Sequence, residues 1–277
     1  MEPSLAVAPT MAATAPVTVG GLIGRTFSTW SRNLVPFALL SLLTQAANFA
    51  FSLWTQYATF GGYPSFQERM STVGGPAALR AGGLPGGYWV VFAVVLFVTI
   101  VLTMVQMGAL TFGAVQHLAG KPVGFGALLG AGFRRIWPVF IAGLMAGLLV
   151  FVGVVLLVVP GIVWACAAAV SVPAVMAEGL GGEAAVRRSF ALTKGRRFKI
   201  FVAYLVMLVA AWAASMVAGI LPLALGGGTA SLVGAFVGFL ITATVTPLWT
   251  LFPAVAYHDL RVEKEGIDTA ELARVFE

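Results

Sequence analysis

Long apolar stretches restrict this chain to a small number of folds. A helix needs about 20 apolar residues to cross a bilayer, because the hydrocarbon core is about 30 Å thick and each residue adds about 1.5 Å. Six stretches meet this requirement or come close to it, at residues 34–54, 88–115, 137–159, 161–177, 198–221 and 231–257. We therefore predict an all-α, polytopic integral membrane protein with six transmembrane helices.

The composition agrees with the bilayer as the solvent of this chain. Of its 277 residues, 60% are hydrophobic and only 9% are charged, whereas about 25% of a typical soluble domain is charged. The net charge of +6 does not indicate nucleic-acid binding, because the basic residues stand in short segments beside apolar runs, where they encode topology. We expect no nucleic-acid partner.

The chain divides into three parts by composition. Residues 1–18 are rich in Ala, Pro and Thr, lack the cationic start of a secretory signal and are predicted to be a disordered tail. Residues 19–260 are the predicted membrane domain, with a Gly- and Pro-rich loop at 55–87, and residues 261–277 are a polar cytoplasmic tail. Pro160 and Gly161 are predicted to form the turn between the third and fourth spans.

Basic residues are distributed unequally between the two sides of the predicted bundle. If the N-terminus is inside, 14 basic residues lie on the inner side and 2, Arg69 and Arg80, on the outer side. An excess of Lys and Arg marks the cytoplasmic side of a membrane protein. We therefore predict cytoplasmic N- and C-termini and residence in a bacterial-type cytoplasmic (inner) membrane.

A basic stretch, EGLGGEAAVRRSFALTKGRRFK at residues 178–199, lies between two apolar runs. As a helix over 183–194 it separates charged side chains from an arc of apolar and small ones, a pattern typical of a helix in a membrane interface. That arc comprises Ala185, Val186, Ser189, Phe190, Leu192 and Thr193. Gly195 is the predicted C-terminal stop.

The same stretch carries six cations, for which two interpretations are open. They are Arg187, Arg188, Lys194, Arg196, Arg197 and Lys199. In the first interpretation they fix the topology and extend to the lipid headgroups. In the second they form a dedicated binding site for anionic lipid or for a protein partner.

Two further amphipathic segments, residues 19–33 and 121–135, also carry basic residues at or next to their ends and are predicted to be in-plane helices. Similar sequences at 32–36, 134–138 and 196–200 each close such a segment and open a span. Three copies of one unit with two spans would account for the six spans. The alternative is that any span entered from the cytoplasm begins with arginines.

Few polar or reactive side chains lie inside the predicted spans. Gln45, Asn48 and Gln106 are predicted to face the bundle interior, because lipid offers no hydrogen-bond partner. Cys166 is the single cysteine, which excludes an intrachain disulfide and a thiolate metal site. There is no HExxH motif, and no serine within a span is matched in depth by a histidine. We predict no catalytic site, no metal and no cofactor.

Three classes of function compete for such a chain. A non-catalytic module that associates with anionic membrane lipids, or with a protein partner, through a basic cytoplasmic belt agrees best with the basic segments. The alternative is a small-molecule or lipid transporter or channel component, which Pro173, Pro247 and Pro253 favour because broken helices frame many transport sites. An intramembrane enzyme is the third class, and no motif favours it.

Three pieces of the chain resemble the membrane domain named after glycerophosphoryl diester phosphodiesterases. They are VGGLIGRTFSTWSRNLVPF, VVPGIVWACAAAVSVPAVMAEGLGGEAAVRRSFALTKGRRF and AYHDLRVEKEGID, and the resemblance covers residues 19–270 apart from the loop at 55–87. In full-length members of that family the phosphodiesterase chemistry resides in a separate soluble barrel. Only a short polar stretch follows the last predicted span, so we expect no such barrel here. The resemblance implies the fold of a stand-alone membrane domain and no reaction.

Overall fold

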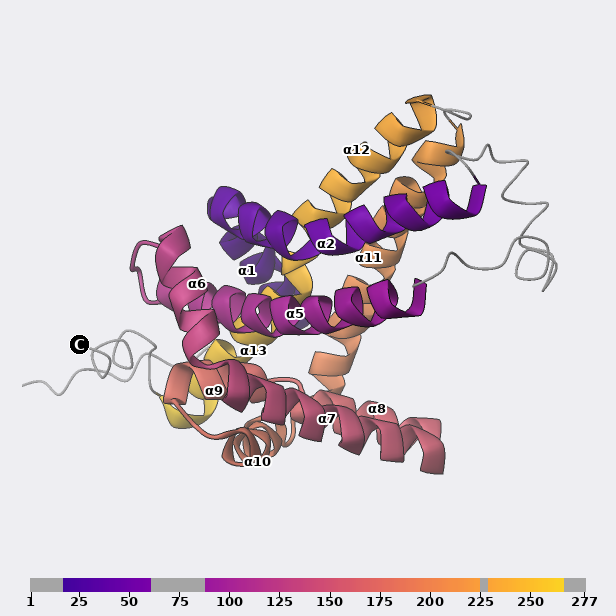
Figure 1. Ribbon diagram of the computed structural model, residues 1–277. Helices are drawn as coiled ribbons and strands as arrows, with labels where there is room; N and C mark the ends of the chain where they lie inside the picture. The colour runs from indigo at the N-terminus through magenta and orange to yellow at the C-terminus, as the bar shows by residue number, and fades with distance from the viewer. Residues whose placement is uncertain (1–16, 61–87, 225–228, 267–277) are drawn as a thin grey trace, which may run out of the picture.

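The structure is a computed structural model that describes residues 17–60, 88–224 and 229–266, and within these ranges it contains helices and no strand (Figure 1). In chain order the helices are α1 (Val19–Arg32), α2 (Leu34–Phe60), α5 (Tyr88–Leu118), α6 (Phe125–Arg134), α7 (Ile136–Leu156), α8 (Val158–Ala168), α9 (Ser171–Glu178), α10 (Gly182–Thr193), α11 (Arg197–Ala224), α12 (Thr229–Val245) and α13 (Pro247–Glu265).

Six helical segments are long and apolar enough to cross a membrane. They are Leu34–Trp54, Trp89–Leu118, Ile136–Leu156, Val158–Glu178, Arg197–Val217 and Leu232–Glu265. The predicted all-α class and the predicted number of membrane-spanning helices are thus confirmed at the level of helix length and composition.

Four short helices gather at one end of the molecule, which we call the charged end. Figure 1 shows α1, α6, α9 and α10 at the left-hand end, together with the C-terminal part of α13. The charged residues of the described ranges lie on these helices, on their connections or at adjoining helix ends. They are Arg25, Arg32, Lys121, Arg134, Arg135, Glu178, Glu183, Arg187, Arg188, Lys194, Arg196, Arg197, Lys199, Asp259, Arg261, Glu263, Lys264 and Glu265.

Helix α13 lies at the centre of the packing. Phe252, Tyr257 and Leu260 are fully buried in the larger core cluster, which also contains side chains of α1, α9, α10 and α11. Leu251 and Ala254 pack against α2, α5 and α6 in a second cluster. By contrast, large apolar side chains along α5, α7 and α8 are exposed, as expected for helix surfaces that face lipid.

Prolines stand in the first turn of five helices, where a helix has no internal partner for the backbone N–H. They are Pro36 of α2, Pro138 of α7, Pro160 of α8, Pro173 of α9 and Pro247 of α13. As a result, two candidate spans are interrupted. Val158–Glu178 consists of α8 and α9, separated at residues 169–170, and Leu232–Glu265 consists of α12 and α13, separated at residue 246.

The turn between the third and fourth spans lies before its predicted position. The extended residue is Leu157, with φ −165° and ψ 143°, whereas Pro160 and Gly161 belong to the first turn of α8. The predicted hairpin is present, but its predicted turn at Pro160 and Gly161 is wrong, because a proline in the first helical turn leaves the helix intact. Gly161 instead lets α8 approach α7 closely at Gly153. The two backbones are so near that a Cβ on Gly153 would lie 2.7 Å from the Gly161 Cα atom.

The segment predicted as a helix at 183–194 is helical as α10, and Gly195 follows it in the left-handed conformation (φ 82°). Its apolar arc packs against α7, α8 and α9 rather than standing free. The buried residues of this arc, each at most 5% exposed, are Ala185, Val186, Ser189, Leu192 and Thr193. The amphipathic pattern is therefore explained by packing on the protein itself, and this face is not available to lipid.

The packed part of the chain extends past both predicted boundaries of the membrane domain. Val17 is buried, and the Thr18 hydroxyl caps α1 by accepting a hydrogen bond from the Gly21 N–H (3.1 Å). Helix α13 continues to Glu265, so the start of the predicted C-terminal tail is helical. The rest of the predicted tails and most of the predicted loop, residues 1–16, 61–87 and 267–277, lie outside the described residues.

Candidate functional site

Five side chains from three helices form a closed network at the charged end. Glu178 ends α9, Arg188 belongs to α10, and Tyr257, Arg261 and Glu265 follow one another at four-residue spacing on α13. The Glu178 carboxylate accepts hydrogen bonds from Arg188 Nε (2.9 Å) and the Tyr257 hydroxyl (2.6 Å), and Arg261 Nη1 lies 3.7 Å away. The Glu265 carboxylate binds Arg188 Nη2 (2.6 Å) and Arg261 Nε (2.8 Å). Two carboxylates and two guanidinium groups thus alternate in a ring, which we call the ion-pair ring.

The ion-pair ring balances its own charge. Its two negative and two positive groups leave no excess charge to attract an ionic ligand, and its Arg261 side chain is only 6% exposed. Removing one partner from a buried ion pair leaves an uncompensated charge in a poorly solvated place. The ring therefore acts as a structural tie between α9, α10 and α13.

The structure brings the six predicted lipid- or partner-binding cations to the charged end but gives several of them protein partners. Arg188 belongs to the ion-pair ring. Arg196 is paired with Glu263, and this hydrogen bond raises the pKa of the Arg196 guanidinium above its ordinary value. Lys199 Nζ donates to the backbone carbonyl of Val17 (2.8 Å).

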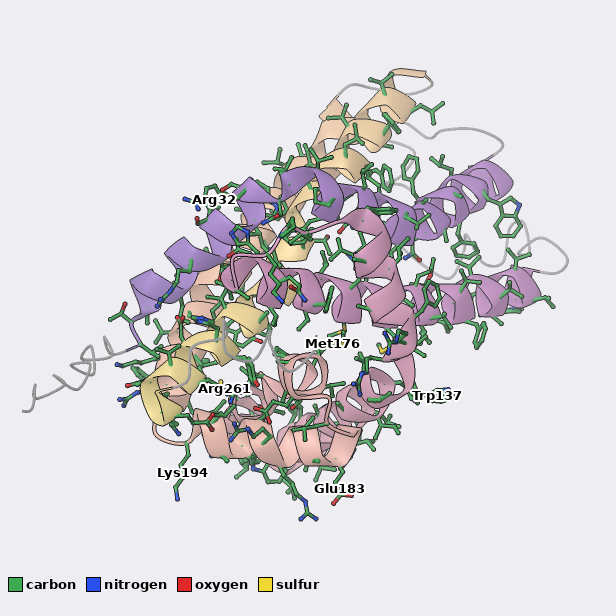
Figure 2. The ribbon with its side chains drawn as sticks, turned by 90° about the vertical axis from the view of Figure 1, so that its left-hand side faces the viewer. Arg32, Trp137, Met176, Glu183, Lys194 and Arg261 are labelled. Carbon is green, nitrogen blue, oxygen red and sulfur yellow. The ribbon has the colours of Figure 1, made fainter. Side chains whose placement is uncertain are left out.

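The other three members of this set form an exposed ion pair or none with the described residues. Arg187 pairs with Glu183 at 2.6 Å, with 80% of the arginine side chain exposed. Arg197 stacks over the ring of Phe190. Lys194 is exposed and makes no ion pair within the described part of the chain, and Figure 2 shows it pointing outward.

Every acidic side chain in the described ranges has a basic partner. In addition to the pairs above, Asp259 is 2% exposed at its side chain and binds Arg25 Nη2 at 2.8 Å. Because basic residues outnumber acidic ones at the charged end, cations remain after this pairing. Arg32, Arg134 and Lys194 are exposed and form no ion pair with any described residue. Figure 2 looks onto this end and shows Arg32 and Lys194 at separate places on its surface.

Several of these partners were missed by sequence reasoning. Tyr257, Asp259, Glu263 and Glu265 fall in the stretch AYHDLRVEKE, which was interpreted as a span end followed by a polar tail. The available signal was the i, i+4 spacing of Arg261 and Glu265, which favours a helix with a charged face. Their partners on α9 and α10 are set by packing and have no signal of this kind.

Gln106, one of three polar residues predicted to face the bundle interior, joins two helices. Its Nε2 donates to the Ser41 hydroxyl (2.7 Å), and its Oε1 accepts from the Thr44 hydroxyl (2.8 Å). These bonds tie α5 to α2, and all three side chains are buried.

Gln45 and Asn48 also bond to other helices. Gln45 Nε2 donates to the Thr246 hydroxyl (3.1 Å) at the α12–α13 junction. Asn48 Oδ1 accepts from the Thr99 hydroxyl of α5 (2.9 Å), although Asn48 itself is exposed. These polar residues cross-link helices in the described structure.

The chemistry of the charged end is therefore that of ion pairing. Within the described residues, no group of three or more His, Cys, Asp or Glu side chains is arranged to hold a metal ion. Six apolar helices of this length are those of a multi-pass α-helical membrane protein. No family model, curated protein or solved structure matches this chain, so the resemblance to the phosphodiesterase membrane domain stays a prediction.

Proposed function

We propose that this protein is a non-catalytic integral membrane module that associates with anionic lipid headgroups through the cations of its charged end. The observation that carries the proposal is the charge imbalance there. All acidic groups of the described residues are already paired, while Arg32, Arg134 and Lys194 are exposed without an ion-pair partner. Each cation near an anionic leaflet contributes about 1 kcal/mol of attraction.

In this proposal the charged end faces the cytoplasm of a bacterial-type inner membrane. The distribution of 14 basic residues on one side and 2 on the other supports that orientation. The lipid-binding set differs from the one predicted from sequence, because Arg188 and Arg196 have partly buried carboxylate partners. Lys194 belongs to both sets.

The test compares anionic lipid retained by the detergent-purified full chain. A triple variant, Arg32→Gln/Arg134→Gln/Lys194→Gln, should retain less anionic phospholipid per protein than the wild type. The loss of binding free energy should be at most about 3 kcal/mol, because three cations are removed. The difference should shrink between low and moderate salt, since exposed charges are screened.

The matched control is Glu183→Gln/Arg187→Gln, which removes a cation together with its paired carboxylate and leaves the net charge unchanged. This variant should retain as much anionic lipid as the wild type. Equal retention by the triple variant, without any dependence on salt, would mean that the cations serve as topology signals alone.

A transporter or channel component is the second candidate function. The observation in its favour is that two of the six candidate spans are interrupted, at residues 169–170 and at residue 246, as in many transporters whose binding sites lie between broken helices. The test measures how fast a fluorescent lipid moves between leaflets. Faster movement in proteoliposomes than in protein-free liposomes would support this candidate.

A further inference from the structure

A cavity of about 420 Å³ lies where both interrupted spans meet α5, α7 and α11. Its wall includes Ala169 from the α8–α9 junction, Thr246 from the α12–α13 junction, and Gly143 and Ala146 of α7. Helix α7 starts at Ile136, so these two residues lie about 10–15 Å along the helix from its start at the charged end. The volume is within the range of small-molecule sites.

The wall of this cavity carries polar groups that have no hydrogen-bond partner within the described part of the protein. They are the hydroxyls of Thr111, Tyr204 and Thr250 and the indole N–H of Trp249. Thr111 is only 1% exposed. Inside a bilayer no bulk water replaces a missing partner, so an unpaired polar group there is costly.

Two prolines add hydrogen-bond acceptors to the same wall. Pro253 stands inside α13 and has no N–H for the carbonyl four residues earlier, and Pro173 has none for the carbonyl just past the end of α8, which no helical N–H reaches; both prolines line the cavity. Those carbonyls belong to Ala169 and Trp249, which are themselves lining residues. The cavity therefore presents hydroxyls, one N–H donor and carbonyls that have no helical donor.

The lining residues include no Asp, Glu, Lys, Arg or His, and all of them belong to the described part of the chain. A phosphate or ammonium headgroup would find no opposite charge here and would lose its hydration. A group that both donates and accepts hydrogen bonds without charge is suited to this wall. Hydroxyl groups meet that requirement, because they can donate to the carbonyls and accept from the Trp249 N–H.

Apolar surface lies next to these polar groups. Met107 and Val172 line the cavity itself. A second groove of about 370 Å³, lined mainly by apolar side chains such as Phe97, Met104 and Phe140, lies against α5 and α7. A ligand with a hydrocarbon chain can place it along these two helices while its polar head stays at the junctions.

We propose that the cavity binds an uncharged, hydroxyl-bearing lipid, with the hydroxyl head at the two helix junctions and the acyl chain along α5 and α7. This site uses no cation of the charged end. Its occupancy is therefore independent of the association with anionic lipid proposed above.

The test measures binding of two probes to the delipidated full chain in detergent by native mass spectrometry. Monooleoylglycerol carries two hydroxyls and no charge, and methyl oleate carries the same acyl chain without a hydroxyl donor. The wild type should bind monooleoylglycerol saturably and at least about threefold more tightly than methyl oleate, as expected for the net gain from one or more hydrogen bonds.

Two glycines of α7 provide a matched pair of variants, because a Cβ on either one meets no atom within 4 Å. Gly143 lines the cavity and Gly147, one turn later, does not. Gly143→Leu should lower monooleoylglycerol affinity about tenfold or more by filling the cavity, whereas Gly147→Leu should bind like the wild type. Tyr204→Phe/Thr250→Val removes two hydroxyls with little change of shape and should reduce the preference over methyl oleate. Equal affinity of the two glycine variants, or equal binding of both probes by the wild type, would overturn the proposal.

Discussion

At the scale of single residues, the ion-pair ring explains how acidic groups are accommodated at the ends of apolar helices. Glu178 ends a candidate span, and a carboxylate beside the bilayer needs a partner. Arg188 and Arg261 provide that partner and also bind Glu265. Tyr257 adds a neutral hydrogen bond to the same carboxylate. The five side chains form one unit in which each depends on the others.

The ring predicts a large stability difference between two arginine substitutions. Arg261→Met leaves Glu178 and Glu265 with one cation between them, so it should lower stability by up to about 3–5 kcal/mol, less where water reaches the carboxylates. Arg187→Met breaks an exposed pair and should change stability by less than about 1 kcal/mol. Thermal unfolding midpoints of the detergent-purified variants measure both effects. Similar midpoints for the two variants would show that the ring contributes little.

At the scale of helices, the α7–α8 hairpin shows how glycine sets the distance between two spans. Gly153 and Gly161 face each other across the hairpin, both buried, and the turn between the two helices is a single extended residue, Leu157. Side chains near the turn, such as Val155 and Val159, are exposed and apolar. The hairpin is therefore closely packed between its two helices and presents apolar surface to its surroundings.

Adding one methyl group to this contact should destabilise the protein. In Gly153→Ala the new Cβ would lie 2.7 Å from the Gly161 Cα. The two backbones would have to move apart to relieve this contact, which should lower the free energy of unfolding by about 1–3 kcal/mol. Gly147→Ala on the same helix meets no atom within 4 Å and should be neutral or stabilising by up to about 1 kcal/mol. Unfolding of the two variants in detergent gives the comparison. A Gly153→Ala protein as stable as Gly147→Ala would contradict the close contact.

At the scale of the whole molecule, the described charges collect at one end and long apolar helices extend away from it (Figure 1). Each of three short helices, α1, α6 and α10, directly precedes a long helix, α2, α7 and α11. This order agrees with three copies of one unit. The internal repeat, the in-plane orientation of the short helices and the sidedness of the termini stay predictions.

The predicted topology can be measured with reporter fusions in a bacterial host. A reporter that is active only outside the cytoplasm should work when fused after Gly74 and fail after Lys121 or Gly182. The physical reason is the cost of translocating the clustered basic residues beside the inner helix ends. Activity after Lys121 with none after Gly74 would reverse the orientation.

Much of the fold could be predicted from sequence because it depends on local properties. A run of about 20 apolar residues forms a membrane helix whatever surrounds it, and Gly195 ends α10 because glycine adopts the left-handed conformation readily. The arc of α10 was also predicted from its period, since the periodicity of a helix determines which side chains share a face. The turn at Leu157 was missed because proline is compatible with the first turn of a helix as well as with a turn.

The class of protein, the number of apolar helices and the excess of cations follow from the amino-acid sequence. The tertiary structure selects which cations are paired, because partners such as Arg196 and Glu263 are 67 residues apart and meet when α13 packs beside the start of α11. It also decided that the apolar face of α10 is covered by protein, since an amphipathic pattern is the same whether lipid or another helix covers it. The cavity has the same origin, because its wall combines side chains from six helices that no local pattern connects.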